Sequence, residues 1–256
     1  MAKIAIVTDS ACDLPAYVVK QYDIKVLPLR VIYEDREYKD GVDIDPQEVY
    51  DRMEREVPKT SLPPAEEVIE LFDQLVVQGY SDVICITLSS KLSGTYNLIQ
   101  MLAGDYDAKI LNIKVIDSKC LSMFLGFIVM ETVMEVKASQ SVDAALSTIT
   151  SMRNKISCSF VLKTLKYLKK GGRIGKVEGT VGELLDIKPI IGIDAEGAYY
   201  TVTKARGRNK SIQRIKELIE TNFKGKTINL AIIHGGAEEE ATSLLVACKN
   251  IINVKE

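Results

Sequence analysis

The segment 88–97, LSSKLSGTYN, gathers several hydroxyl side chains and a glycine directly after the apolar run DVICIT (82–87). The apolar run predicts a buried strand, and the residues from about Ser93 onwards predict a helix. Serine and threonine hydroxyls can attack a substrate or donate hydrogen bonds to an anion. Because the N–H groups at a helix start also attract anions, this segment is a candidate for catalysis or for anion binding.

Catalysis by a nucleophilic serine is the less favoured of these two readings. Such a serine requires a neighbouring base, and the sequence has one histidine, His234, at the end of LAIIH. Ser93 lies in KLSGT, which lacks the GxSxG pattern of many hydrolase nucleophiles.

Nucleotide and metal sites are also disfavoured. The segment GGRIGKV (171–177) is one residue short of a Walker loop and has Val177 where a magnesium-binding hydroxyl belongs, which favours a basic surface turn. The carboxylates of DGVDID (40–45) lack the spacing of an EF-hand, which favours a solvated turn and helix cap. We expect no metal ion and no cofactor.

Anion binding agrees with the other polar clusters of the sequence. These are TDS (8–10) and DSK (117–119), each at a predicted strand end, and KTSLPP (59–64), with a hydroxyl pair at an expected N-cap position. Ligands of parallel α/β sheets bind beyond the carboxyl ends of the strands. We expect Ser90, Ser93 and Thr95 to supply donors there and Gly94 to admit a ligand close to the backbone. The alternative interpretation is that each cluster only caps the start of a helix.

Composition places the chain among globular proteins without a nucleic-acid partner. The 256 residues carry a net charge of −2, and the five cysteines form no CxxC pair, so we expect buried thiols in a reducing cytoplasm.

The N-terminus lacks the features of a secretory signal. The apolar stretch 120–136 is short for a membrane span and contains Glu131 and Glu135, so we expect a buried helix and no stable membrane insertion.

Strand and helix patterns alternate up to about residue 150, which predicts a parallel sheet between two helical layers. Pro28 predicts an edge position or a break within the apolar run 24–33. Further on, residues 187–206 predict an antiparallel hairpin, and INLAIIH (228–234) predicts a strand. We therefore predict a two-domain α/β fold. Its parts are an N-terminal parallel three-layer domain, residues 1–152, and a smaller α/β domain with a mixed or antiparallel sheet, residues 153–256.

The sequence resembles the DegV family of bacterial fatty-acid-binding proteins. The matching segments occur in the family's order and include VTDSACDLP, KTSLPP, TLSSKLSGTYN, VIDSKCLSMFLG, YLKKGGRIGK, LLDIKPIIGIDAEG, KARGRNKSI and AIIHGG. The resemblance implies two α/β domains with a long-chain fatty acid bound between them. It also implies that Thr60, Ser61, Ser93 and Gly94 hold the carboxylate.

The resemblance further implies a non-catalytic protein that presents the acid to a separate fatty acid kinase, which makes the acyl-phosphate. Arg173, Lys204 and Arg206 are then the residues expected to meet that kinase, with solvated surface charge as the equal alternative. The apolar helix around 120–136 is a candidate wall for the acyl chain, and an ordinary core helix is the other reading.

Two departures from the family pattern are visible. Leu62 stands where the family usually has Gln, near the expected head-group position. Family members also continue past the position of Glu256 into a glycine-rich segment with a carboxylate-supporting histidine, so the resemblance implies a second domain shortened at its C-terminus. Two alternatives stay open: an enzyme acting on a small phosphorylated or carboxylated metabolite in the same crevice, and a family member without lipid affinity.

Overall fold

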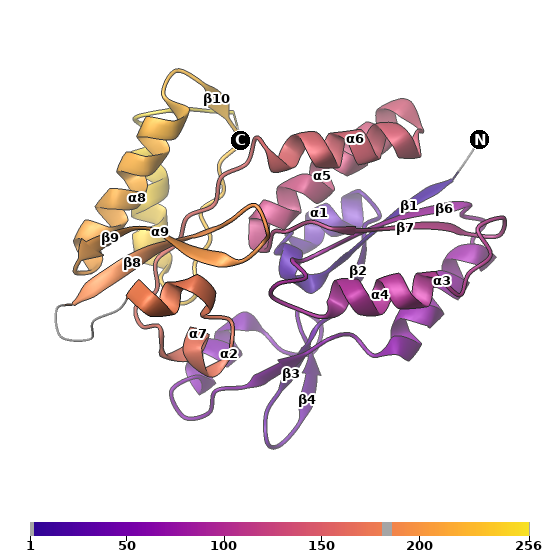
Figure 1. The fold of residues 1–256 in the computed structure, drawn as a ribbon, viewed down its shortest axis with the longest axis horizontal. Coiled ribbons are helices and arrows are strands. Elements are labelled where there is room, and N and C mark those ends of the chain that lie inside the picture. Colours follow the sequence, from indigo (N-terminus) through magenta and orange to yellow (C-terminus); the bar gives the residue numbers. More distant parts are fainter. Residues whose placement is uncertain (1–2, 181–185, 256) are drawn as a thin grey trace. The chain divides into compact units, whose positions relative to one another are not determined.

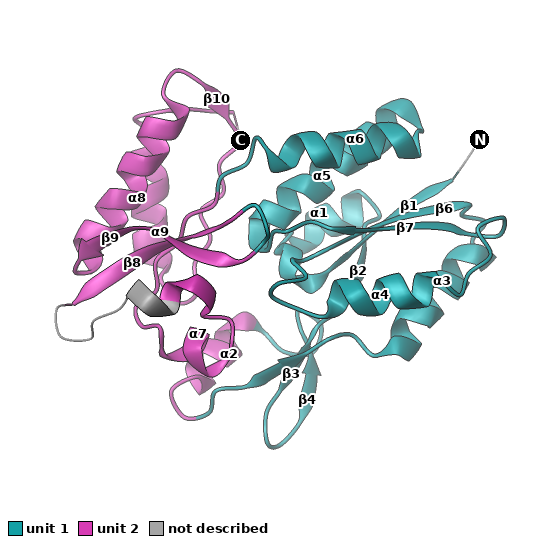
Figure 2. Cartoon of the chain, viewed as in Figure 1, with its two compact units in different colours: residues 1–45, 56–157, 195–197 teal, residues 46–55, 158–194, 198–256 magenta. Residues whose placement is uncertain are grey.

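The computed structural model describes residues 3–180 and 186–255, and the chain divides into two compact units (Figures 1 and 2). Unit 1 consists of residues up to Asp45, Glu56–Ser157 and Ala195–Gly197; unit 2 consists of Pro46–Arg55, Cys158–Asp194 and the residues from Ala198 onwards. The domain boundary predicted between residues 152 and 153 stays a prediction.

Unit 1 holds the elements β1 (Ile4–Asp9), η1 (Ser10–Cys12), α1 (Ala16–Gln21), β2 (Lys25–Leu27), β3 (Arg30–Ile32), β4 (Glu37–Lys39), β5 (Lys59–Ser61), α3 (Ala65–Val77), β6 (Asp82–Thr87), α4 (Thr95–Ala103), β7 (Asn112–Asp117), α5 (Ser122–Ser139) and α6 (Val142–Arg153). Unit 2 holds α2 (Pro46–Arg52), α7 (Lys166–Lys170), η2 (Gly175–Thr180), β8 (Ile187–Ile193), β9 (Tyr199–Arg206), α8 (Arg208–Phe223), β10 (Thr227–Ile228), α9 (Glu238–Lys249) and β11 (Asn253–Val254).

A parallel sheet with the strand order β2-β1-β6-β7 forms the centre of unit 1. The central strands β1 and β6 are buried along almost their whole length, as their continuous apolar runs require. Helices α3 and α4 cover one face, where Phe72 and Ile99 belong to the core, and α5 covers the other (Figure 1). The predicted α/β class, with a parallel sheet and separate antiparallel sheets, is confirmed.

Helix α5 contains the apolar stretch that predicted a buried helix. Leu125, Ile128 and Val129 are fully buried in it, and its N-terminal half contacts η1 closely: a Cβ on Gly126 would lie 2.7 Å from the Cys12 carbonyl oxygen. Within residues 3–180 and 186–255, no helix combines the length and apolar character needed to cross a membrane.

The apolar run 24–33 is interrupted at Pro28, as predicted: β2 ends at Leu27 and β3 begins at Arg30. Strand β2 lies at an edge of the parallel sheet, whereas β3 is the middle strand of a small antiparallel sheet in the order β4-β3-β5. Strand β5 contains Thr60 and Ser61, which we expected at a helix N-cap. That expectation was wrong, because Pro64 is the N-cap of α3 and makes no side-chain cap bond.

In unit 2, β8 and β9 form the predicted antiparallel hairpin, and α8 follows directly. The strand predicted over residues 228–234 was wrong for most of its length. In the described part of the chain, Thr227–Ile228 pair with Asn253–Val254 of β11, and residues 229–234 pair with no strand. Ile233 accordingly has an exposed side chain.

Candidate functional site

The hydroxyl loop, residues 88–94, joins the C-terminal end of β6 to α4 (Figure 1). Asp9, the last residue of β1, accepts a 2.7 Å hydrogen bond from the Leu88 N–H. Asp117, the last residue of β7, accepts a 3.1 Å hydrogen bond from the Ser90 N–H. Because β1 and β7 flank β6 in the sheet, the loop is held from both sides.

Ser93 is half-buried near the end of this loop, directly before Gly94, the N-cap of α4. Its Oγ atom lies 2.9 Å from Thr95 Oγ1 and accepts a 3.3 Å hydrogen bond from the Thr95 N–H. When the Thr95 hydroxyl is the donor of this pair, the Ser93 hydroxyl can donate its own proton to a ligand oxygen. The first N–H groups of α4 lack intrahelical acceptors and add a positive dipole end, so this position suits an anion.

Thr60 and Ser61 directly precede Leu62, which lies beside Gly94. Both are exposed on β5, and Leu62, which follows them, packs against the loop: its Cδ2 atom lies 3.4 Å from where a Cβ on Gly94 would be. The two hydroxyl motifs, distant in sequence, are therefore neighbours within unit 1.

Asp9 shapes the electrostatics of the sheet edge. Burial raises the pKa of its carboxyl group to about 7, although the hydrogen bonds from the Leu88 and Ala11 amides act in the opposite direction. The negative charges of Asp13 and Asp40 raise this pKa further. Near neutral pH, Asp9 thus carries only part of a negative charge, which limits its repulsion of an anionic ligand.

Other hydroxyls that the sequence placed at this edge have internal partners. The Ser90 hydroxyl, expected to be a ligand donor, donates to Asp117 at 2.5 Å, and the Ser10 hydroxyl donates to Asp40 at 2.7 Å. The clusters TDS (8–10) and DSK (117–119) were predicted at this edge, but the role of Asp9 and Asp117 as acceptors for the hydroxyl loop was not predicted. Their signal in the sequence is an aspartate at the carboxyl end of each strand next to β6.

The residues expected to meet a partner all belong to unit 2 and are exposed. Arg173 follows α7 and donates a 2.6 Å hydrogen bond to the Gly171 carbonyl oxygen. Lys204 and Arg206 are two residues apart on β9 and so project from the same face of the hairpin.

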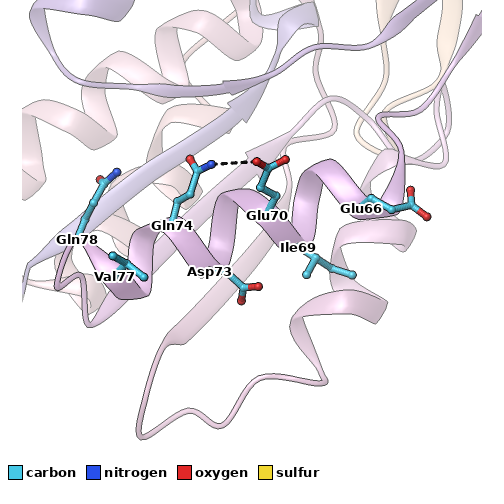
Figure 3. Close-up of a pocket in the computed structure, with 7 residues that line it drawn as sticks. All are labelled: Glu66, Ile69, Glu70, Asp73, Gln74, Val77 and Gln78. Atoms are coloured by element: carbon cyan, nitrogen blue, oxygen red, sulfur yellow. Dashed lines mark hydrogen bonds between the residues drawn. The ribbon is translucent and has the colours of Figure 1, made fainter.

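Two surface hollows lie along single helices. One, of about 550 Å³, follows the outer face of α3, where Glu66, Glu70 and Asp73 alternate with Ile69 and Val77 (Figure 3). The other, of about 480 Å³, follows α6. Neither includes the four predicted head-group residues. Within the described chain, no group of three or more His, Cys, Asp or Glu side chains is arranged to hold a metal ion.

Comparison with known proteins gives a family match over nearly the whole chain. The family model described as "Uncharacterised protein, DegV family" matches residues 3–256. A DegV domain-containing protein of Clostridium acetobutylicum is 43% identical over 256 residues, which cover 99% of this chain and 90% of that relative. Protein DegV of Bacillus subtilis is 31% identical over 248 residues, which cover 94% of this chain and 86% of that relative.

Solved structures described as fatty-acid-binding are similar over 99% or more of this chain. A DegV family protein from Thermus thermophilus, described by its fatty acid binding, has a TM-score of 0.89 at 27% identity, with 90% of its chain covered. The fatty acid binding protein DegV from Bacillus subtilis has a TM-score of 0.89 at 29% identity, with 91% covered. A stearic-acid-binding protein from Eubacterium ventriosum has a TM-score of 0.81 at 30% identity, with 90% covered.

Proposed function

The chain belongs to the DegV family, and from this premise we propose that it binds a long-chain fatty acid. The carboxylate is held by Ser93 and the start of α4, together with Thr60 and Ser61. The observation that carries this proposal is the packing of Leu62, the residue after Ser61, beside Gly94, the residue after Ser93. The description of similar structures as fatty-acid-binding proteins supports the choice of ligand.

Elementary energetics suit such a ligand. Each buried CH₂ group contributes about 0.8 kcal/mol, so a 16-carbon chain gains on the order of 10 kcal/mol before ordering costs. An unpaired carboxylate would cancel much of this gain, whereas hydroxyl and backbone donors offset its desolvation. Half-buried apolar side chains of α5, Met123, Phe124 and Phe127, are candidates for contact with the acyl chain.

The protein then acts as a non-catalytic carrier that presents the carboxyl end to a fatty acid kinase, which forms the acyl-phosphate. Arg173, Lys204 and Arg206 contact that kinase. The positive charge of these exposed side chains supports this proposal, because it suits an acidic surface on the partner.

Lipid extraction followed by mass spectrometry tests the ligand. Protein purified from a bacterial host is expected to carry a C14–C18 fatty acid. Ser93→Ala should weaken hexadecanoic acid binding roughly 10- to 100-fold, because a hydrogen bond to a charged oxygen is lost. Ser139→Ala is the matched control, since that hydroxyl donates to the Glu135 carbonyl within α5, accepts the Ser141 N–H and has no bond to the hydroxyl loop. Lipid-free protein that also rejects added hexadecanoic acid overturns the proposal.

The carrier role has its own test. With ATP and a fatty acid kinase, the loaded protein should yield acyl-phosphate, and Arg173→Glu should slow this reaction without changing hexadecanoic acid affinity. Turnover of a small phosphorylated or carboxylated metabolite by the protein alone would instead identify it as an enzyme.

A further inference from the structure

Asp117 is the acceptor for three donors at the carboxyl edge of the parallel sheet. Its Oδ1 atom accepts hydrogen bonds from the Ser90 N–H at 3.1 Å and from the Lys119 N–H at 2.9 Å. Its Oδ2 atom accepts the Ser90 hydroxyl at 2.5 Å. One carboxylate therefore ties the middle of the hydroxyl loop to the loop that follows β7.

The position of Asp117 makes this tie short. Thr87 and Asp117 are register partners in the pairing of β6 with β7, so the hydroxyl loop begins directly beside Asp117. Ser90 in turn lies one helical turn before Ser93, whose N–H donates to the Ser89 carbonyl oxygen at 3.1 Å. The turn that Asp117 holds at Ser90 thus also carries Ser93.

We propose that Asp117 is a positioning residue that holds residues 88–94 in the conformation that binds a carboxylate. This inference rests on the proposed function and assigns Asp117 no contact with the ligand. A carboxylate that contacted an anionic head group would repel it. Asp117 instead has both oxygens occupied by donors of the protein itself, and its contribution is the geometry of Ser93.

Two substitutions separate this role from a need for negative charge. In Asp117→Asn, the remaining oxygen can accept both backbone N–H groups, and the amide nitrogen can donate to the Ser90 hydroxyl, which is able to accept. All three hydrogen bonds survive with one reversed. In Asp117→Ala, the Ser90 and Lys119 amides lose their acceptor, and the loop is released.

Asp82 supplies a matched control at the opposite end of β6. Its carboxylate accepts two hydrogen bonds from side chains. One comes from the Asn112 amide at 2.7 Å, and the other from the hydroxyl of the adjacent Ser81 at 2.7 Å. Thr87 lies five positions further along the strand, which places Asp82 roughly 16 Å from the hydroxyl loop. Asp82→Ala removes a comparable carboxylate without touching residues 88–94.

The experiment measures the affinities of the full chain and its variants for hexadecanoic acid and for hexadecan-1-ol, which has the same tail without a carboxylate. Asp117→Ala should weaken acid binding roughly tenfold or more and alcohol binding less than about threefold. Asp117→Asn and Asp82→Ala should keep acid affinity within about threefold of the unsubstituted chain. Amide hydrogen exchange should show lost protection at residues 88–93 in Asp117→Ala alone.

Unchanged acid affinity in Asp117→Ala overturns the inference, and so does an equal loss for the acid and the alcohol, which indicates a purely structural role. If the unsubstituted chain binds neither probe, the proposed function fails. The exchange measurement then decides by itself whether Asp117 holds the loop, and unchanged protection in Asp117→Ala would contradict that.

Discussion

Replacing Gly197 by alanine perturbs the packing behind the hydroxyl loop. Ser89 donates a 2.8 Å hydrogen bond from its hydroxyl to the Gly197 carbonyl oxygen, and both residues belong to unit 1. Gly197 has a φ angle of +86°, and a Cβ there would overlap the Ser89 hydroxyl and lie 3.0 Å from Lys119 Cα. The substitution therefore strains the backbone and displaces Ser89.

The magnitude follows from three contributions. A side chain at this φ costs about 1–2 kcal/mol, the lost hydrogen bond about 1 kcal/mol, and the steric overlap about 1 kcal/mol or more. Gly79→Ala is the control, because Gly79 has a φ of +77° and nothing within 4 Å of the added Cβ. Only the first contribution applies there, so the two variants should differ by roughly 2 kcal/mol.

Differential scanning calorimetry measures this difference. A loss of 2 kcal/mol lowers the Tm of a unit of this size by roughly 4–8 °C, and Gly197→Ala should unfold that far below Gly79→Ala. Adding Ser89→Gly to Gly197→Ala removes the overlapping hydroxyl and should recover part of the loss. Equal Tm values for the two single variants would show that the overlap with Ser89 does not destabilise the protein.

The remaining predictions concern the core and the charged groups of unit 1. Gly126→Ala brings a Cβ to 2.7 Å from the Cys12 carbonyl oxygen and should lower the Tm by roughly 4–8 °C in calorimetry; an unchanged Tm would contradict this. The Asp9 carboxyl should titrate near pH 7 in ¹³C NMR, against about 3.9 when unfolded, and a midpoint below pH 5 would be contrary. Protonation of Asp9 therefore contributes its full amount to the free energy of unfolding below about pH 4, and this contribution is lost as the pH rises through 7. Arg30→Met removes a guanidinium group, 4% exposed, that pairs with Glu67 at 2.6 Å. Lys39 still pairs with Glu67 at 2.8 Å, so the loss in urea unfolding should be roughly 1–3 kcal/mol; an unshifted midpoint would exclude this.

The parallel sheet and the place of the hydroxyl loop could be predicted because their signals are local. The runs IAIVTD and DVICIT are apolar on both faces, which parallel strands under helices require, and each ends in polar residues. Pro28 marked the break between β2 and β3 for an equally local reason, since it has no N–H for a sheet ladder.

Pairings between distant, polar segments could not be predicted. Strand β5 is three exposed residues long and shows no apolar alternation, so only its pairing with β3 identifies it as a strand. The bond of Ser90 to Asp117 joins residues far apart in sequence, and no periodicity reports it. The run INLAIIH was misleading for the opposite reason. Its apolar residues resemble a buried strand, but Ile228 alone among them pairs with another described strand.

A crystal structure of the protein with 16-bromohexadecanoic acid would show where the fatty acid binds, because the bromine marks the tail and the density shows the head group. We expect carboxylate oxygens about 2.5–3.2 Å from Ser93 Oγ and from the hydroxyl of Thr60 or Ser61. A carboxylate bound elsewhere, such as in the hollow along α3, with these hydroxyls free of ligand, would contradict this expectation.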